Sequence, residues 1–273
     1  MICRAEQPIL FADFALDNRC KRRAQAAQED FASVPSAITL SNVSEEGTVY
    51  TAAETATLAC VAHTHGLHVH LDGTRFANAV CSNRHVGGST EAAELTWRAG
   101  VDVMSFGCTK NGAMGADLVI FFNTDLIADF QYRLKRSGHL PSKMRFLSAQ
   151  ILALLLDDVW LRNATNANAM AAHLHEGLEQ LSKKCRAYSN RRMEPPELAE
   201  ANEVFVEMDA HIVADMKGRG HLFQATAVAG KHGMLRVRLV PAWCTDRQEC
   251  DELLAALHEC LQLPLTVPSV PRL

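Results

Sequence analysis

The stretch VDVMSFGCTKNGAMGADLVIFFN, residues 101–123, places a single lysine between two strongly apolar runs. These runs, at 101–106 and 117–123, have the length and composition of buried strands. Lys110 lies in the glycine-rich loop that joins them. Taken alone, a lysine in a loop is a solvated surface charge more often than a reactive amine, so the surrounding sequence has to distinguish the two.

Helix and strand patterns alternate on the N-terminal side of this stretch. Thr51 followed by Glu54 predicts a capping box, and helical spacing continues from there to Gly66. LHVHL at 67–71 alternates apolar and polar residues as a strand does, and STEAAELTWRA at 89–99 predicts another helix. This alternation predicts an α/β layer with a largely parallel sheet.

A different pattern follows on the C-terminal side. Residues 145–184 predict one long bridging helix, whose second half carries apolar residues on one face, at 167, 170, 171, 174, 178 and 181. Three strand patterns come next, at 203–208, 221–228 and 235–240. A last amphipathic helix is predicted from Thr245, with Gln248 as its capping-box partner, to about residue 261. The sequence therefore predicts a second, smaller α+β domain.

Composition excludes several classes of protein. The 273 residues are 48% hydrophobic and 21% charged, and the formal charge of −4 offers no electrostatic footprint for nucleic acid. No apolar run approaches the roughly 20 residues needed to span a bilayer, and residues 1–30 lack the pattern of a signal peptide. Nine cysteines, an odd number without a CxxC pair, predict free thiols in a reducing compartment, and hence a cytoplasmic protein.

Two reactive groups follow neighbouring strand patterns. Asp72 directly follows LHVHL, and Lys110 lies four residues beyond VDVMSF. Ligands of open α/β sheets bind outside the carboxyl ends of the strands, so these side chains are expected at one crevice. Pyridoxal phosphate needs a lysine for covalent attachment and an acidic partner for its ring nitrogen. The pair is therefore compatible with that cofactor, although Asp-Gly is more often a turn.

Several motifs resemble the threonine aldolases, in the aromatic amino acid beta-eliminating lyase group of fold-type-I pyridoxal-phosphate enzymes. The resemblance covers roughly residues 38 to 262, with the motifs in the family's order. They are VHLDGTRFANAV, VDVMSFGCTKNGAMGADLVIFFN, SGHLPSKMRFLSAQ, DDVWLRNATNANAMAAHL, EANEVFV and RLVPAW. The resemblance implies an α/β three-layer large domain with a smaller C-terminal α+β domain.

The resemblance also implies a domain layout. The family's N-terminal part supplies a phosphate cradle and a ring-stacking side chain, and neither has a recognisable counterpart in residues 1–37. We therefore expect a divergent segment at 1–37, a partial cofactor-binding domain at 38–160 and a small domain at 161–273. Because the large domain would be incomplete, exposed sheet edges and uncovered apolar surface are expected.

Cofactor contacts are implied for four residues. Lys110, in the loop described above, would hold pyridoxal phosphate covalently, and Asp72 would contact its pyridine nitrogen. Thr109 and Arg145 would contact its phosphate.

Two arginines are implied as ligands of the substrate carboxylate, Arg75 from DGTR and Arg238 from RLVPAW. A planar guanidinium suits such recognition because it can donate two parallel hydrogen bonds. Arg236 and Arg238 share one face of an alternating strand, and we interpret Arg236 as a surface charge.

The implied activity is cleavage of a β-hydroxy-α-amino acid, such as threonine, allo-threonine or phenylserine, to glycine and an aldehyde. The implied assembly is a homo-oligomer, a dimer or a tetramer. An alternative is an inactive, aldolase-like interaction protein. The resemblance identifies no general base in this chain.

A histidine cluster supports a less favoured alternative, a metal-dependent hydrolase. HTHGLHVH places His63, His65, His68 and His70 within eight residues, and His-x-His is a metal-ligand spacing. His63 and His65 also suit the C-terminal end of a helix, where a histidine cation interacts favourably with the helix dipole. The sequence alone leaves both interpretations open.

Overall fold

The computed structural model describes residues 35–82, 92–185 and 191–262. The chain divides into two compact units, Met1–Thr165 and Asn166–Leu273. The sequence analysis placed the corresponding boundary between residues 160 and 161. Of the divergent segment expected at 1–37, all but the last three residues lie outside the described part of the chain. The two units are described separately.

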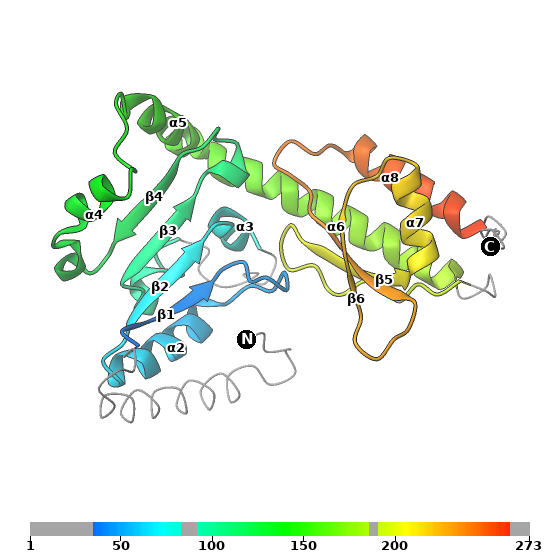
Figure 1. Cartoon of the computed structure of the whole chain (residues 1–273), viewed down its shortest axis with the longest axis horizontal. Coiled ribbons are helices and arrows are strands. Elements are labelled where there is room, and N and C mark those ends of the chain that lie inside the picture. Colours follow the sequence, from blue (N-terminus) through cyan, green and yellow to red (C-terminus); the bar gives the residue numbers. More distant parts are fainter. Residues whose placement is uncertain (1–34, 83–91, 186–190, 263–273) are drawn as a thin grey trace, which may run out of the picture. The chain divides into compact units, whose positions relative to one another are not determined.

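The first unit contains a four-stranded sheet. Its strands are β1 (Ala37–Ser41), β2 (His68–Gly73), β3 (Val103–Gly107) and β4 (Asp117–Phe121), in the order β1-β2-β3-β4 (Figure 1). The first three strands are parallel, and β4 is antiparallel to β3. The predicted strands at 67–71, 101–106 and 117–123 are thus confirmed, as is a largely parallel sheet.

The connections explain these directions. A crossover helix, α2 (Ala52–Thr64), links β1 to β2 and allows them to run parallel. The predicted capping box begins this helix, because Thr51 N–H donates to the Glu54 carboxylate at 2.8 Å and Glu54 N–H donates to Thr51 Oγ1 at 3.3 Å. Between β3 and β4 only a short loop intervenes, so the chain must return antiparallel.

The prediction of a helix at 89–99 is wrong for residues 92–99, which are the part of this range that the structure describes. Residues 92–96 form turns, and only a 3₁₀ turn, Trp97–Ala99, follows. Thr96 interrupts a helix because its backbone has φ −126° and ψ −107°, while its hydroxyl donates to Ala92 O at 2.8 Å. The turn ends at Gly100, whose φ of +87° is left-handed, as glycine permits.

The long helix predicted at 145–184 is two helices, α5 (Arg145–Leu155) and α6 (Val159–Cys185). The break comes at Asp157, whose φ of +52° cannot continue a right-handed helix. Apolar spacing continues across the break, which is why the sequence pattern suggested one helix. Two further helices of the first unit were not predicted, α3 (Phe76–Val80) and α4 (Phe130–Arg136).

The two faces of the first sheet differ in polarity. One face buries Leu71 and Met104 in a core that also contains Phe76, Phe106 and Trp160. These three rings contact one another, with centroids 5.6 to 6.5 Å apart. The opposite face carries half-buried polar residues, chief among them His70, Asp72 and Ser105. The alternation of the strands therefore gives the sheet one apolar and one polar face.

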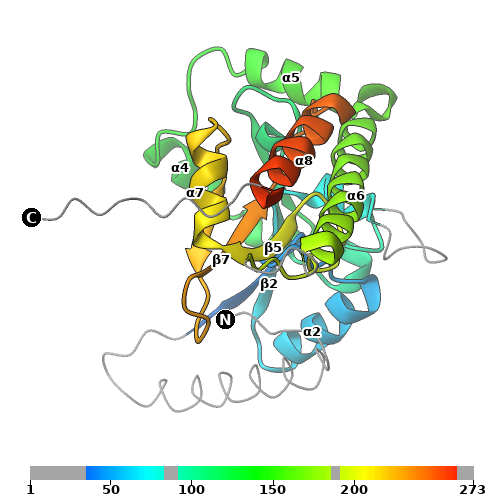
Figure 2. The ribbon, with the colours of Figure 1, turned by 90° about the vertical axis from the view of Figure 1, so that its right-hand side faces the viewer.

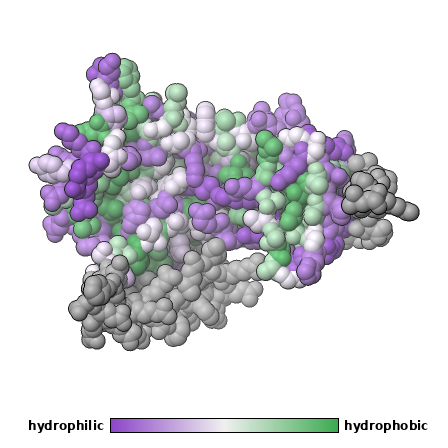
Figure 3. Space-filling view, viewed as in Figure 1, coloured by the Kyte–Doolittle hydropathy of each residue, from purple (hydrophilic) through white to green (hydrophobic). Residues whose placement is uncertain are grey.

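The first unit also exposes several large apolar side chains. Val119 on β4 is 46% exposed, and Figure 3 shows apolar surface over the β3–β4 part of the sheet. On and next to α5 the exposed residues are Phe146, Leu152, Leu155 and Leu156. Among the described strands, β1 and β4 form the edges of this sheet.

The Asp102 carboxylate links α2 to the sheet, at the end where β3 begins. Asp102, just before β3, accepts hydrogen bonds from Val69 N–H at 2.8 Å and Asn123 Nδ2 at 3.0 Å, and His63 Nε2 lies 2.8 Å away. Burial alone would raise the pKa of Asp102, but the bonds from His63, Val69 and Asn123 and the charge of His63 together lower it. The folded chain therefore favours the ionised carboxylate.

We predict that Asp102→Ala destabilises the first unit by about 2–3 kcal/mol, because it leaves the Val69 N–H without its acceptor. The folded-state pKa lies below the ordinary 3.8, so the contribution is present above pH 3.8 and is lost as pH falls through the folded value. Urea unfolding of both proteins at pH 7 and pH 3 measures this difference. Asp125→Ala, at an exposed position, should change stability by less than about 0.5 kcal/mol; equal effects of the two substitutions would contradict the prediction.

The second unit is a three-stranded antiparallel sheet covered by helices. Its strands are β5 (Val204–Asp209), β6 (Gln224–Ala227) and β7 (Met234–Leu239), in the order β5-β7-β6. Figure 2 shows α6, α7 (Ala210–Gly218) and α8 (Arg247–Gln262) gathered over these strands. The three predicted strands and the final helix are confirmed.

The predicted apolar face of α6 is confirmed as well. Its residues join the core of the second unit with side chains of β5, β7, α7 and α8. The α6 members of this core are Ala171, Leu174, Leu178, Leu181 and Cys185; of the other predicted positions, Met170 packs against the core partly buried and Ala167 is buried. This helix therefore contributes to the core through one stripe, as the periodicity indicates.

The capping box of α8 differs from the predicted one. Asp246, not Thr245, caps the helix: Glu249 N–H donates to Asp246 Oδ1 at 2.9 Å, and Asp246 N–H donates to Glu249 Oε2 at 3.0 Å. Thr245 instead accepts from Ala242 N–H, at 2.9 Å, in the preceding turn. Both spacings fit the motif, and only the backbone geometry distinguishes them.

No helix of the described residues is both long and apolar enough to cross a membrane. The seven cysteines in this part of the chain, Cys60, Cys81, Cys108, Cys185, Cys244, Cys250 and Cys260, are free thiols.

Candidate active site

The candidate site begins at the carboxyl ends of β2 and β3. Asp72 and Ser105 are direct partners in the parallel register of these strands, and Lys110 lies five residues beyond Ser105. The side chain of Asp72 is half-buried, and Lys110 is exposed. Both groups were expected to follow neighbouring strands, at the carboxyl ends of those strands. The register of β2 and β3 agrees with this expectation.

Two glycines allow the loops at this edge to approach closely. A Cβ on Gly107 would lie 2.6 to 2.9 Å from backbone atoms of Thr74, and one on Gly73 would lie 2.8 Å from Ser105 O. Real Cβ atoms do not tolerate such distances to backbone atoms. The loop after Asp72 therefore packs directly against the end of β3, from which the lysine loop starts.

The lysine loop is fixed on both sides of Lys110. On one side, Asp117 Oδ1 accepts from Cys108 N–H at 2.7 Å and from Thr109 N–H at 3.1 Å. On the other, Asn111 Nδ2 donates to Trp160 O at 2.8 Å, and Asn163 Nδ2 donates to Asn111 O at 2.9 Å. Lys110 thus stands on an anchored 3₁₀ turn, Thr109–Asn111, and not on a loose surface loop.

We predict that Gly107→Ala displaces this loop and destabilises the first unit by about 1–3 kcal/mol, because the new methyl group would overlap Thr74. Thermal unfolding measures the loss. Gly218→Ala is the matched control, since nothing lies within 4 Å of the added Cβ and alanine favours a helix. Equal melting temperatures for Gly107→Ala and the unmodified chain would refute the close approach.

Asp72 is oriented by its own turn. Thr74 donates two hydrogen bonds to Asp72 Oδ1, one from its backbone N–H at 3.1 Å and one from its hydroxyl. The second carboxylate oxygen takes part in neither bond. Arg75, one residue further along, directly precedes α3 and is half-buried. The sequence motif DGTR therefore forms a compact turn that holds the Asp72 carboxylate at the carboxyl end of β2.

The remaining cofactor candidates have other contacts in the structure. Thr109 donates its hydroxyl to Asp117 Oδ1 at 3.2 Å. Arg145, at the start of α5, is exposed, and its guanidinium lies over the Phe146 ring, 5.2 Å from the centroid. Their assignment to a phosphate stays a prediction.

Cys108 is not a nucleophile at this site. Burial, together with the neighbouring charge of Asp117, raises the pKa of its thiol to about 11. At neutral pH the thiol therefore stays protonated.

The four clustered histidines contact three different sets of groups. His63 and His68 both approach Asp102 Oδ2, at 2.8 and 3.8 Å. His65 Nδ1 lies 2.9 Å from the Val61 carbonyl, and His70 contacts hydroxyl groups on the neighbouring strands. Within residues 35–82, 92–185 and 191–262, no group of three His, Cys, Asp or Glu side chains is arranged to hold a metal ion. The structure therefore gives the metal-hydrolase interpretation no support.

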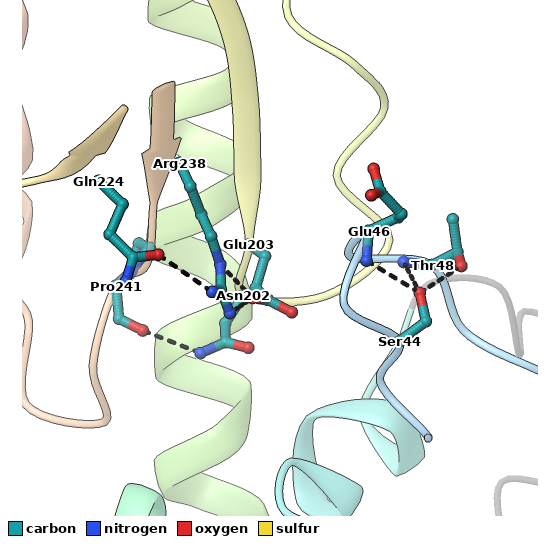
Figure 4. Close-up of polar contacts among 8 residues, drawn as sticks. All are labelled: Ser44, Glu46, Thr48, Asn202, Glu203, Gln224, Arg238 and Pro241. Carbon is teal, nitrogen blue, oxygen red and sulfur yellow. Dashed lines mark hydrogen bonds and ion pairs between the residues drawn. The ribbon is translucent and has the colours of Figure 1, made fainter. Parts of the chain in front are cut away.

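Arg238, the second predicted carboxylate ligand, lies on β7 in the second unit. Its Nε donates to Glu203 Oε1 at 2.7 Å, its Nη2 contacts the same oxygen, and its Nη1 donates to Gln224 Oε1 at 3.4 Å (Figure 4). The Glu203 side chain is 0% exposed and that of Arg238 is 20% exposed. Sequence spacing gave no signal for this ion pair, because its partners are 35 residues apart.

The interpretation of Arg236 as a solvated surface charge is wrong. Its Nε and Nη2 donate to the two carboxylate oxygens of Glu197, at 2.9 and 3.0 Å. Its guanidinium also lies 4.0 Å from the centroid of Phe205. The side chain is only 18% exposed, because β5 and the preceding segment supply these partners.

The sequence analysis also missed the turn after β1. Ser44 Oγ accepts from Glu46 N–H at 3.3 Å and from Thr48 N–H at 3.1 Å (Figure 4). The preceding Asn42 donates its N–H to Asp72 O at 3.0 Å, so this turn starts beside Asp72. A serine four residues before a threonine, with glycine between them, was the available signal.

A model of the beta-eliminating lyase family matches residues 17–229 of the chain. The match covers more than half of the sequence and includes both Asp72 and Lys110. The chain belongs to the beta-eliminating lyase family. This match starts within the 1–37 segment, for which the sequence analysis found no counterpart, and ends before Arg238.

Two curated relatives that match the chain share one name. The chain is 38% identical over 219 residues to a low specificity L-threonine aldolase of Pseudomonas aeruginosa, covering 80% of this chain and 58% of the relative. It is 37% identical over 224 residues to a low specificity L-threonine aldolase of a Pseudomonas species, covering 82% and 59%. The chain thus spans about three-fifths of the length of these two relatives.

Solved structures agree with this family in fold. A Leishmania major threonine aldolase structure matches with a TM-score of 0.74 and 24% identity, covering 88% of this chain and 66% of that one. Other fold-type-I pyridoxal-phosphate enzymes are also among the structural neighbours. The predicted fold class of this beta-eliminating lyase family member is therefore confirmed.

Proposed function

We propose that this chain is a pyridoxal-phosphate-dependent lyase of the threonine aldolase type, cleaving β-hydroxy-α-amino acids such as threonine and phenylserine to glycine and an aldehyde. The observation that supports the proposal is the anchored turn that carries Lys110, which follows β3, the parallel neighbour of the strand that contains Asp72. Similarity to two low specificity L-threonine aldolases supports the substrate class.

The residues present fit the cofactor. Lys110 is a primary amine on an exposed turn, and Asp72 is a carboxylate with one oxygen held by Thr74. Lys110 would therefore hold pyridoxal phosphate, and Asp72 would face its ring nitrogen. When bound, this cofactor supplies a sink for the electrons of a bond broken at the substrate's Cα.

The protein's own groups would bind, orient and hold protons. Asp72 would keep the proton on the ring nitrogen, because a nearby carboxylate favours the protonated form. Arg75 and, from the second unit, Arg238 are our candidates for the substrate carboxylate, and Thr109 and Arg145 for the cofactor phosphate. The Cys108 thiol stays neutral beside Lys110 and adds no charge to the site.

The cytoplasm as location and a homo-oligomer, a dimer or a tetramer, as assembly belong to the same proposal. Light scattering of the purified chain tests the second point directly. A monomer that binds the cofactor would contradict the oligomer and leave the lyase proposal standing.

Two measurements on the purified chain test the function. We expect an absorption band in the visible on adding pyridoxal phosphate, and release of glycine and acetaldehyde from threonine. The band without any product from threonine, allo-threonine or phenylserine would contradict the lyase activity. Absence of both in a folded protein would favour the alternative, an aldolase-like interaction protein.

A further inference from the structure

His70 stands in a row of polar side chains that crosses three strands. Its Nε2 lies 2.9 Å from Ser105 Oγ on β3, and its Nδ1 lies 3.4 Å from Thr39 Oγ1 on β1. Both partners are hydroxyl groups, which can donate or accept a hydrogen bond. The ring can therefore gain or lose a proton without losing either partner.

The position of His70 relates it to Asp72. The two residues are i and i+2 on β2, so their side chains lie on the same face of the sheet. Ser105 is the direct register partner of Asp72, and its hydroxyl bonds to His70. Ser105 therefore lies next to Asp72 in the sheet and forms a hydrogen bond with the imidazole of His70.

Few other charges face His70. On β2, His68 lies on the same face but approaches Asp102. On β4, Asp117 shares the face but accepts from the N–H groups that precede Lys110. The facing residues of β1 are uncharged. Asp72 is therefore the charged neighbour to which the protonation of His70 matters most.

We propose that His70 is a positioning residue whose protonation controls how strongly the Asp72 carboxylate can serve the cofactor. When His70 is neutral, the negative charge of Asp72 is available to the ring nitrogen of pyridoxal phosphate. When His70 is protonated, its positive charge also attracts the Asp72 carboxylate. The cofactor part of this inference rests on the proposed function, and the coupling between the two side chains does not.

Electrostatics fit this arrangement. Burial lowers the pKa of His70 below its ordinary value of 6.5, and the charge of Asp72 partly offsets that effect. Because this pKa lies below 6.5, the imidazole is neutral at pH 7 and becomes protonated only at a pH below 6.5. Because the folded pKa is lowered, acidification through this range also reduces stability.

The first test uses the chain without cofactor. Histidine C2 protons are followed by NMR against pH, and the His70 signal is assigned by its loss in His70→Asn. In Asp72→Asn we expect the pKa of His70 to fall further, because the offsetting charge is gone. The exposed His139, which contacts Ser137, is the internal control and should not shift. An unchanged His70 pKa in Asp72→Asn would overturn the coupling.

The second test measures pyridoxal phosphate affinity between pH 5 and 8. We expect binding to weaken about fivefold or more on acidification in the unmodified chain, as is typical of two coupled sites, and less in His70→Asn. His68→Asn, on the same strand and face, should keep the unmodified dependence. Identical profiles in all three proteins would refute the role of His70. If no protein binds the cofactor, the proposed function fails, and the NMR titration still decides the coupling.

Discussion

Lys110→Ala is expected to abolish the visible absorption band with pyridoxal phosphate and to lower lyase turnover by about a thousandfold or more, since it removes the only amine of the anchored turn. Borohydride should fix the cofactor onto Lys110 in the unmodified chain, which peptide mass spectrometry can detect. Because Lys110 is exposed, its loss should change stability by less than about 0.5 kcal/mol.

Lys135→Ala is the matched control for this experiment. Lys135 is an exposed lysine of the same unit, on α4 and not on the turn that carries Lys110. The control should keep the band, the labelling pattern and the activity. Borohydride labelling of another lysine, with the band intact in Lys110→Ala, would show that the assignment of Lys110 is wrong.

Arg238→Ala is expected to destabilise the second unit by about 3–5 kcal/mol, because it removes the Arg238 guanidinium from the fully buried carboxylate of Glu203. Urea unfolding measures the loss. Arg247→Ala is the control: its side chain is 71% exposed and lies 3.9 Å from Asp251, so its loss should cost less than about 1 kcal/mol. Similar stability of Arg238→Ala and the unmodified chain would contradict the prediction.

This effect complicates any test of Arg238 as a substrate ligand. A lost activity in Arg238→Ala could follow from unfolding alone, so a second variant is needed. In the double variant with Glu203→Gln, the buried charge is removed as well, and the stability loss should be smaller than the sum of the single losses. Activity compared at equal folded fraction then isolates substrate binding: a raised KM for threonine would support the role, and an unchanged KM would exclude it.

Much of the fold followed from local patterns. The capping box at Thr51, the alternation around His70 and the apolar stripe of α6 are each specified by residues within one element. The failures were local as well: Thr96 and Asp157 adopt backbone conformations that end a helix, while their neighbours keep helical spacing. Periodicity reports which face is apolar and does not report where the backbone breaks.

The sequence by itself also placed Asp72 and Lys110 after neighbouring strands, because strand order and loop position can be read along the chain. Only the tertiary structure decided which side chains they and the other candidates contact. Asp117 accepts hydrogen bonds from the lysine loop, Asp102 contacts two of the four histidines that resembled a metal site, and Glu203 forms an ion pair with Arg238. Hydrogen bonds and ion pairs depend on distances of a few ångströms between residues far apart in sequence. Packing of the strands and loops sets those distances, and no spacing rule along the chain contains them.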